Sequence, residues 1–257
     1  MVELQERAPE FEQNGIRICA ISYDTVEVLR DFARKHTITY PLLADTDSAV
    51  IRRFGIFNTH IPQDHDWYGV PFPGIVMTDA EGFVIERSFY ASHGLRDAVG
   101  RTLHDVFHVN DVSKGVVREA RADRVRASAY LSSKIVRPSQ VLTFTVDIEV
   151  DKGSHIYGRP LPENYLPTTL TFQEVEDVHF GQVQYPEPQL HHLRGLGETL
   201  PIYDGRIELK ASIRNSRREG FTVRARLQYQ ACDEEVCYLP EQIDFELPLD
   251  YSGYVSS

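Results

Sequence analysis

Two cysteines near the end of the chain, Cys232 and Cys237, are the residues best placed for chemistry. Apolar and polar residues alternate before them, over 221–229, and again after them, over 243–249. Two such runs joined by a short polar segment predict a β-hairpin with the cysteines at its mouth. Facing positions on antiparallel strands lie about 4.5–5.5 Å apart, within the Cα separation of a disulfide. The pair can therefore open and close with little backbone movement, as thiol–disulfide exchange requires.

The same pair has a structural alternative, a passive bridge. Closing a loop of about six residues removes only roughly 2 kcal/mol of unfolded-state entropy, and a chain of 257 residues can bury a core without it. A zinc site is less favoured because C-x4-C is not a usual zinc spacing, although His191 and His192 could complete four ligands. The exchange site and the bridge both stay open, and we expect no metal and no cofactor.

The segment between the cysteines is acidic and consists of Asp233, Glu234, Glu235 and one apolar residue. Nearby negative charge disfavours a thiolate, so the pKa of both thiols is predicted to lie at or above the ~8.5 of free cysteine. A thiol of high pKa is a poor leaving group, which favours the disulfide and makes the dithiol a reductant. We therefore expect a slow and selective electron donor.

The predicted hairpin carries a conflict of register. If the two cysteines face each other, Leu227 faces Gln242 rather than Ile243, and the two apolar sets are out of register by one residue. A slip of one residue puts side chains on the wrong face, so a β-bulge must intervene. Pro240 lacks a ladder donor, and we expect irregular pairing over 238–241.

Residues 229–240 resemble the active-site hairpin of the N-terminal domain of the thiol:disulfide interchange protein DsbD. The matching motifs are Tyr-Gln-Ala-Cys at 229–232 and Cys-Tyr-Leu-Pro at 237–240. Upstream, Gly-Ser-His-Ile-Tyr at 153–157 resembles the strand that lies beside the cysteines in that family. The resemblance covers about residues 125–250 and implies an immunoglobulin-like sandwich that passes electrons through one cysteine pair.

The resemblance also implies roles for single residues. Cys237 would form a mixed disulfide with a thioredoxin-like partner protein, and Cys232 would resolve it. Residues 191–195 lie where the family has its cap loop, but here Leu193 stands in place of the usual aromatic shield and the cap is a few residues longer. The implied partner-binding residues are His155, Tyr157, Leu193, Tyr203 and Tyr238.

The first part of the chain, residues 1–107, alternates between helical and strand patterns. Strands are predicted at 16–22, 74–78 and 83–89, and helices at 25–35, 47–54 and 95–106. Cys19, inside the apolar strand 16–22, is predicted to be a small buried hydrophobe. The loop Asp64-His65-Asp66, with His60 nearby, is predicted to be solvated rather than metal-binding, because consecutive loop residues rarely converge on one ion.

This order of elements, with the segments 21–24, 40–45 and 70–74, resembles the alkyl hydroperoxide reductase/thiol-specific antioxidant (AhpC/TSA) family. Those are peroxiredoxin-like proteins of thioredoxin fold. Pro73 lies where that fold carries a cis-proline, and a Pro-rich trans turn is the open alternative. The family's active cysteine lies on the helix that precedes the strand equivalent to 16–22. Residues 1–11 resemble the latter part of that helix, and they contain no cysteine.

We therefore expect the first domain to be N-terminally shortened, with no peroxidase activity. The strand that lies centrally in a thioredoxin sheet, between the equivalents of 16–22 and 74–78, is missing as well. Its loss leaves backbone N–H and C=O groups of its neighbours without partners. The sequence thus predicts a gap or a substitute strand at this place, and a mobile N-terminus.

Periodicity lapses over 108–124, where charges of both signs alternate, and this segment is predicted to be a linker. From 125 to 257 the period is two, with turn residues between the runs, which predicts an all-β sandwich. The predicted fold is therefore two-domain, an incomplete thioredoxin-like α/β domain followed by an all-β immunoglobulin-like sandwich. The leading hypothesis is a thiol–disulfide oxidoreductase, and the alternative is a non-enzymatic adaptor with a structural disulfide hairpin.

Composition restricts partners and location. A formal net charge of −11 disfavours nucleic acid and anionic membranes as partners. No apolar run approaches the ~20 residues of a membrane span, and residues 1–6 lack the basic and apolar regions of a signal peptide. We expect a soluble, cytoplasmic chain, or a periplasmic one if an upstream N-terminus is missing.

Overall fold

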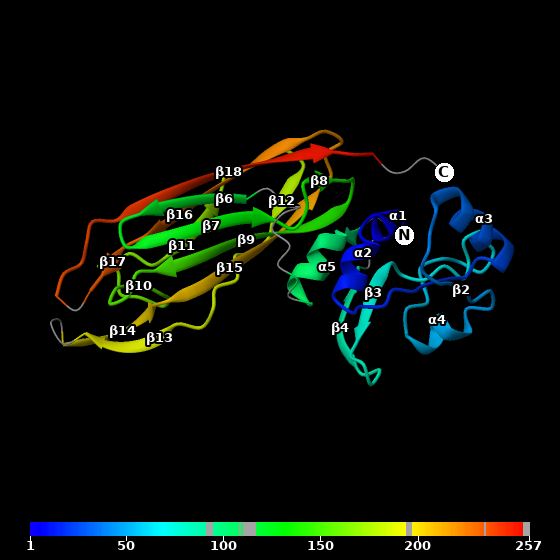
Figure 1. The fold of residues 1–257 in the computed structure, drawn as a ribbon, viewed down its shortest axis with the longest axis horizontal. Coiled ribbons are helices and arrows are strands. Elements are labelled where there is room, and N and C mark those ends of the chain that lie inside the picture. The colour runs from blue at the N-terminus through cyan, green and yellow to red at the C-terminus, as the bar shows by residue number, and fades with distance from the viewer. Residues whose placement is uncertain (91–94, 108, 110–116, 194–196, 234, 254–257) are drawn as a thin grey trace. The chain divides into compact units, whose positions relative to one another are not determined.

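The computed structural model describes residues 1–90, 95–107, 109, 117–193, 197–233 and 235–253. The chain divides into two compact units, Met1–Val109 and Asn110–Tyr254. The first unit mixes helices with short strands, whereas the second consists of strands (Figure 1). The predicted fold class is thereby confirmed. Among the described residues, no helix has the length and apolar character needed to cross a membrane.

The first unit contains short elements. They are α1 (Val2–Glu6), α2 (Ala8–Gln13), β1 (Ala20–Ser22), α3 (Val26–His36), β2 (Leu42–Ala44), α4 (Ala49–Arg53), β3 (Gly74–Thr78), β4 (Val84–Phe89), β5 (Arg96–Asp97) and α5 (Val99–Asp105). Helix α3 begins where its sequence predicts, because the Thr25 hydroxyl accepts a hydrogen bond from the Val28 amide at 3.4 Å. The helices predicted at 47–54 and 95–106 are present but shorter.

Strands β1 to β4 of this unit form two separate sheets. Strand β1 pairs in parallel with β2, and β3 pairs antiparallel with β4. Within the described part of the chain, no ladder joins β1 to β3. The predicted gap between these two strands is therefore confirmed, whereas the predicted mobility of the N-terminus stays a prediction.

In the first unit, one local prediction was wrong and one open alternative is decided. Cys19 is exposed rather than buried. Ile16 and Ile18 pack against the apolar cluster around Phe11, so alternation turns Cys19 to the opposite side. The peptide bond before Pro73 is trans, since the cis bond found among the described residues is Arg159–Pro160. The trans form is the default for X–Pro bonds.

The second unit is built from thirteen described strands. They are β6 (Val117–Ala122), β7 (Val125–Leu131), β8 (Ile135–Val136), β9 (Gln140–Val150), β10 (His155–Tyr157), β11 (Thr169–Phe172), β12 (Val178–Phe180), β13 (Gln189–Leu193), β14 (Glu198–Tyr203), β15 (Arg206–Asn215), β16 (Phe221–Tyr229), β17 (Ala231–Cys232) and β18 (Glu241–Tyr251).

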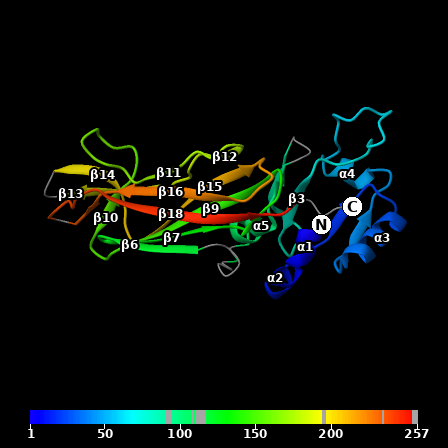
Figure 2. The same cartoon turned by 90° about the horizontal axis from the view of Figure 1, so that it is seen from above.

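These strands form a sandwich with a small third sheet at one end. One layer has the order β12–β15–β9–β7–β6 and the other β11–β16–β18–β8. Their inner faces meet in an apolar core, where Phe144 of β9 lies edge-on to Phe172 of β11 with ring centroids 5.1 Å apart. The third sheet, β13–β14–β10–β17, lies at the end of this unit that holds the cysteines (Figures 1 and 2).

The predicted linker is shorter than 108–124. Residues 117–122 form β6, which pairs with β7 from Val117 opposite Tyr130 to Ala122 opposite Val125. Strand β6 is an edge strand, and its charged residues Arg118 and Arg121 are exposed. Edge strands often carry charged side chains that point outward. The segment therefore lacks an apolar repeat, and its sequence pattern is the same as that of a linker. The rest of the predicted linker, except Val109, Asp123 and Arg124, lies outside the described residues.

We predict that limited proteolysis will degrade the first unit before the second. Two-stranded sheets are marginally stable by themselves, whereas the sandwich layers have four or more strands each and should open only with the whole domain. Trypsin digestion followed by mass spectrometry should show early cleavage within 1–90 and accumulation of a fragment that contains 117–253. Accumulation of an intact first unit instead would contradict this.

Candidate functional site

The hairpin that carries the cysteines changes register by one residue. Strands β16 and β18 pair regularly up to Tyr229 opposite Glu241, with Leu227 opposite Ile243. Beyond this ladder, Cys232 faces Cys237, one residue away from the position that the ladder would give. The predicted break is therefore confirmed.

The break is held by hydrogen bonds around Tyr238. The Tyr238 amide donates to the Ala231 carbonyl at 2.9 Å, and the Gln230 side-chain amide donates to the Tyr238 carbonyl at 3.0 Å. Leu239 and Pro240 take up the extra length in the second strand, since only Gln230 lies between the two paired stretches in the first. After the break, β17 leaves the sandwich layer and pairs with β10, which puts His155 opposite Cys232.

The two sulfurs are joined in a disulfide and lie in different environments. The Cα atoms of Cys232 and Cys237 are 4.0 Å apart. Cys232 is 1% exposed and belongs to an apolar cluster with Tyr157, Leu193, Leu200 and Ile202, whereas Cys237 is exposed. Cys237 is therefore the cysteine on the solvent side of the pair, and Cys232 is the buried one.

The Tyr157 hydroxyl lies between the sulfurs, 3.3 Å from each. It can donate its proton to one sulfur at a time. Burial raises the pKa of Tyr157 to about 12, with smaller effects of Tyr165 and Glu198 in the same direction. At neutral pH the phenol is thus protonated, and it can act as a hydrogen-bond donor to whichever sulfur carries negative charge.

Other predicted site residues surround the buried sulfur. The rings of His155 and Tyr157 meet edge to face with centroids 5.7 Å apart, and the His191 ring lies 6.1 Å from that of His155. Leu193 is 5% exposed and packs in the cluster that buries Cys232. Leu193 thus helps to bury Cys232, while Arg194 and Gly195 of the predicted cap lie outside the described residues.

Tyr203 and Tyr238, the other predicted partner-binding residues, make hydrogen bonds to neighbouring segments. The Tyr203 hydroxyl donates to the Pro186 carbonyl at 3.0 Å, which directs this side chain toward the loop before β13. The Tyr238 hydroxyl donates to Asp233 Oδ2 at 2.6 Å and accepts from Arg124 Nη2 at 2.6 Å. Tyr203 therefore supports the strand that flanks Tyr157, and Tyr238 holds the loop that joins the cysteines.

Asp233 organises that loop. Its Oδ1 accepts from the amides of Glu235 and Val236, at 2.9 and 2.8 Å. The hydrogen bond from Tyr238, followed by these two amides, lowers the pKa of Asp233 to about 2. Sequence reasoning treated this carboxylate only as a charge near the thiols, whereas in the structure its oxygens are bound to Tyr238 and to the loop backbone.

Arg124 is the member of the site that sequence reasoning missed. It lies in the two-residue turn between β6 and β7, more than a hundred positions before Tyr238, and its guanidinium also stands over the Tyr238 ring, 4.7 Å from the centroid. The segment was assigned to the linker, and no local pattern connects Arg124 with the cysteine hairpin. Only the fold brings the two together.

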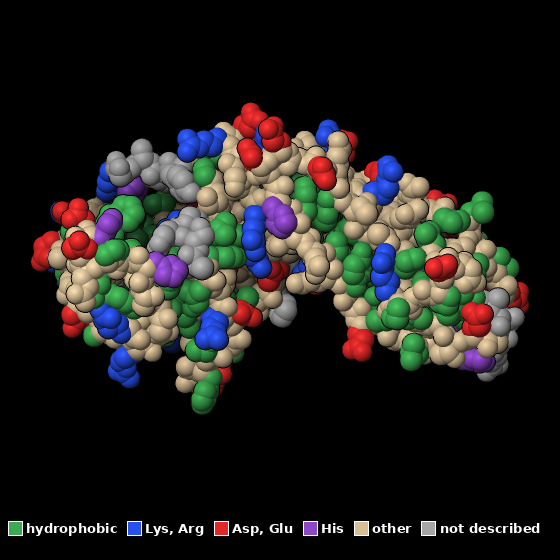
Figure 3. Space-filling model, turned by 180° about the vertical axis from the view of Figure 1, so that it is seen from behind, with side chains coloured by type: hydrophobic (Ala, Val, Ile, Leu, Met, Phe, Trp, Pro, Cys, Tyr) green, Lys and Arg blue, Asp and Glu red, His purple; other side chains and the backbone are tan. Residues whose placement is uncertain are grey.

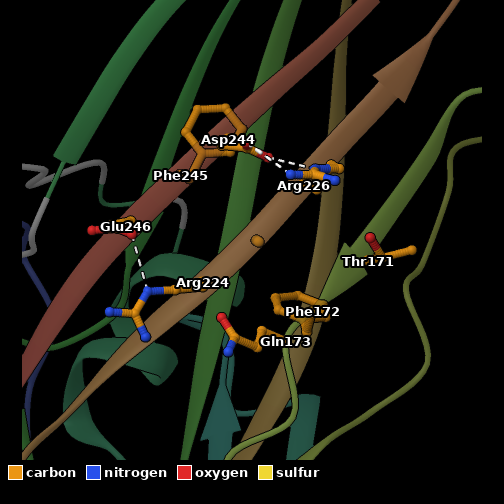
Figure 4. Close-up of a pocket in the computed structure, with 9 residues that line it drawn as sticks. Thr171, Phe172, Gln173, Arg224, Arg226, Asp244, Phe245 and Glu246 are labelled. Carbon is orange, nitrogen blue, oxygen red and sulfur yellow. Dashed lines mark hydrogen bonds and ion pairs between the residues drawn. The ribbon is translucent and has the colours of Figure 1, made fainter.

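The outer face of the sandwich carries charged side chains that form ion pairs. A hollow of about 400 Å³ on the outer face of β16 and β18 contains two cross-strand ion pairs, Arg224–Glu246 and Arg226–Asp244 (Figure 4). Exposed pairs of this kind add little stability and leave no charge for a ligand. Acidic and basic side chains are interspersed on the face seen in Figure 3. Over the described residues, no three metal-ligating side chains converge.

Comparisons with protein families match both parts of the chain. Residues 1–87 match the model of the AhpC/TSA family. Residues 126–249 match the model "Thiol:disulfide interchange protein DsbD, N-terminal". The two matches fall on the two regions whose motifs resemble these families, as the sequence predicted. Among curated proteins, none matches the chain.

Solved structures give weaker likenesses. The N-terminal periplasmic domain of ScsB from Proteus mirabilis is 16% identical with a TM-score of 0.36, over 51% of this chain and 49% of that one. The chain thus spans about half the length of that structure. The reduced DsbD N-terminal domain of Neisseria meningitidis is 16% identical with a TM-score of 0.30, over 58% and 94%. The same domain in complex with the PilB N-terminal domain is 16% identical with a TM-score of 0.30, over 51% and 80%.

We predict that the Asp233 carboxyl titrates near pH 2, and that Tyr238→Phe raises this midpoint toward the ordinary 3.8. Because the folded-state pKa is lowered, the stabilisation of the loop is complete above about pH 4 and is lost as the pH falls through 2. NMR detection of the side-chain carboxyl carbon measures both values. Asp244, whose pKa is lowered by Arg226, is the internal control and should not change. An unchanged Asp233 midpoint in the variant would contradict the assigned cause.

Proposed function

We propose that this AhpC/TSA–DsbD N-terminal fusion relays electrons between proteins through the Cys232–Cys237 pair. A thiol–disulfide redox role in general follows from the matched families and the disulfide. The observation that carries the finer proposal is the asymmetry of the pair: Cys237 is an exposed residue, Cys232 is 1% exposed, and the Tyr157 hydroxyl lies 3.3 Å from both sulfurs. This arrangement admits attack at one sulfur and supports the departure of the other.

The relay begins with a partner dithiol. A partner thiolate attacks the Cys237 sulfur in line with the disulfide, a new sulfur–sulfur bond forms, and the Cys232–Cys237 bond breaks. Cys232 leaves with the electron pair as a thiolate. The Tyr157 hydroxyl, 3.3 Å away, donates a hydrogen bond to it, which offsets part of the cost of a charge in an apolar cluster.

A second partner thiol then completes the transfer. It attacks the partner's own sulfur in the mixed disulfide, releases Cys237 as a thiolate, and leaves the partner oxidised and this pair reduced. The reverse sequence, in which Cys237 attacks an acceptor disulfide and Cys232 resolves the mixed disulfide, passes the two electrons on. Both directions use Cys237 as the sulfur that meets the partner, which we infer to be a thioredoxin-like protein.

The first unit has no assigned electron-transfer step in this proposal. The chain contains three cysteines, and the one in this unit, Cys19, is exposed and outside the matched position of the family's active residue. We propose that the unit is an antioxidant-type module without its active cysteine. A redox relay of this kind suits an oxidising compartment, and we favour the periplasmic alternative for the chain.

We predict that Cys232→Ser traps a covalent complex with a thioredoxin-like protein whose resolving cysteine is replaced by serine and whose remaining cysteine is first converted to its mixed disulfide with thionitrobenzoate, which departs as the Cys237 thiolate attacks; we predict that Cys237→Ser forms no such complex. The first variant keeps the exposed thiol, whereas the second keeps the buried one. Both are made in a Cys19→Ser background, because Cys19 is an exposed third thiol. Non-reducing electrophoresis over time measures the complex. Equal or faster trapping by Cys237→Ser would reverse the assigned roles.

The competing hypothesis, an adaptor with a structural bridge, makes a different prediction for redox equilibrium. A structural disulfide resists reduction to below about −300 mV, whereas a relay pair equilibrates with glutathione or thioredoxin buffers above that value. We predict a midpoint above −300 mV, measured by quenching aliquots with an alkylating reagent and counting modified cysteines by mass spectrometry. A pair that remains oxidised throughout the buffers would favour the adaptor.

A further inference from the structure

The loop between the cysteines is held by a chain of three side chains, which we call the latch: Arg124, Tyr238 and Asp233. Arg124 donates to the Tyr238 hydroxyl at 2.6 Å, and this hydroxyl donates to Asp233 at 2.6 Å. Asp233 in turn binds the amides of Glu235 and Val236. The latch thus connects the turn between β6 and β7 with both ends of the loop.

None of the latch's hydrogen bonds involves a sulfur atom. Its bonds join side-chain oxygens, a guanidinium and backbone amides, so reduction of the disulfide breaks none of them directly. Two further backbone bonds close the same loop: the Asp233 amide donates to the Val236 carbonyl, and the Tyr238 amide donates to the Ala231 carbonyl, both at 2.9 Å. The framework that brings the Cα atoms of the cysteines to 4.0 Å can therefore persist in the dithiol.

We propose that the latch sets the thiol–disulfide equilibrium of the pair, holding the reduced cysteines together so that the disulfide re-forms readily and the dithiol is a stronger reductant. This inference rests on the proposed relay and names the positioning residues of the same site. Without the latch, opening the disulfide would release a loop of four residues. The conformational freedom gained would favour the reduced form.

The size of the effect follows from the bonds involved. A hydrogen bond to a charged group is stronger than one between neutral groups, and part of its stabilisation differs between the open and the closed loop. A loss of about 1.4 kcal/mol is tenfold in an equilibrium constant, which for a two-electron couple corresponds to about 30 mV. Removing one latch bond should therefore shift the equilibrium with glutathione about tenfold toward the dithiol.

Tyr238→Phe is the decisive variant, because it removes the central hydroxyl of the latch, keeps the ring under Arg124 and changes no charge. Glu235→Gln is the matched control: it removes an exposed carboxylate from the same loop and leaves the latch in place. Both variants, and the full chain, carry Cys19→Ser. The oxidised forms are first compared by thermal unfolding, so that a misfolded variant is recognised.

We expect the equilibrium constant of Tyr238→Phe with glutathione to shift about tenfold toward the dithiol, and that of Glu235→Gln by clearly less. In the reduced parent protein, the amides of Glu235 and Val236 should remain protected from hydrogen exchange. An equilibrium within twofold of the parent for Tyr238→Phe, an equal shift for Glu235→Gln, or loss of that protection on reduction would each overturn the latch. If the parent disulfide never equilibrates, the relay itself fails, and the inference with it.

Discussion

The cysteine pair depends on one constraint, the one-residue change of register in the hairpin that carries it. Up to Tyr229, the ladder of β16 and β18 keeps the apolar residues of both strands in the sandwich core. At Gln230 the first strand leaves this layer and joins β10. Cys232 consequently enters the small apolar cluster at the end of the sandwich, while Cys237, on the returning strand, stays at the surface. The difference in exposure between the sulfurs is thus a product of strand geometry.

The sequence predicts this part of the molecule well because its signals are local. Strand faces repeat every second residue, so the conflict between Leu227 opposite Ile243 and Cys232 opposite Cys237 can be found by counting. Arg124 could not be found in this way, since its partner Tyr238 is distant in sequence and the edge strand before it has no apolar repeat. The prediction that Cys19 is buried was wrong for a related reason. An alternating pattern indicates a strand, but it does not indicate which face of the strand the rest of the domain covers.

The two units differ in how far their strands are paired. In the sandwich, every long strand has neighbours on both sides or lies at an edge that carries charge. In the first unit, β1 and β3 belong to separate two-stranded sheets, although the sequence matches the AhpC/TSA family throughout this region. Helix α3 nevertheless begins as its sequence predicts, because the hydrogen bond that caps it joins Thr25 to Val28 within one helical turn. Strand pairing, by contrast, needs partners far away in the chain, and in this unit it is limited to the pairs β1–β2 and β3–β4.

Burial of one sulfur has a consequence for selectivity. A thiolate at Cys232 forms inside an apolar cluster, where charge is costly, and the neutral phenol of Tyr157 is the polar group within 3.3 Å that can offset this cost. This hydrogen bond stabilises the Cys232 thiolate only in a reaction in which a thiolate attacks the sulfur of Cys237 and Cys232 is the leaving group. A small thiol can start that reaction, but its mixed disulfide is readily reversed by Cys232 beneath it. In the proposed relay, a partner with a second thiol close by can complete the exchange before this reversal, which favours dithiol partners over monothiols by kinetics.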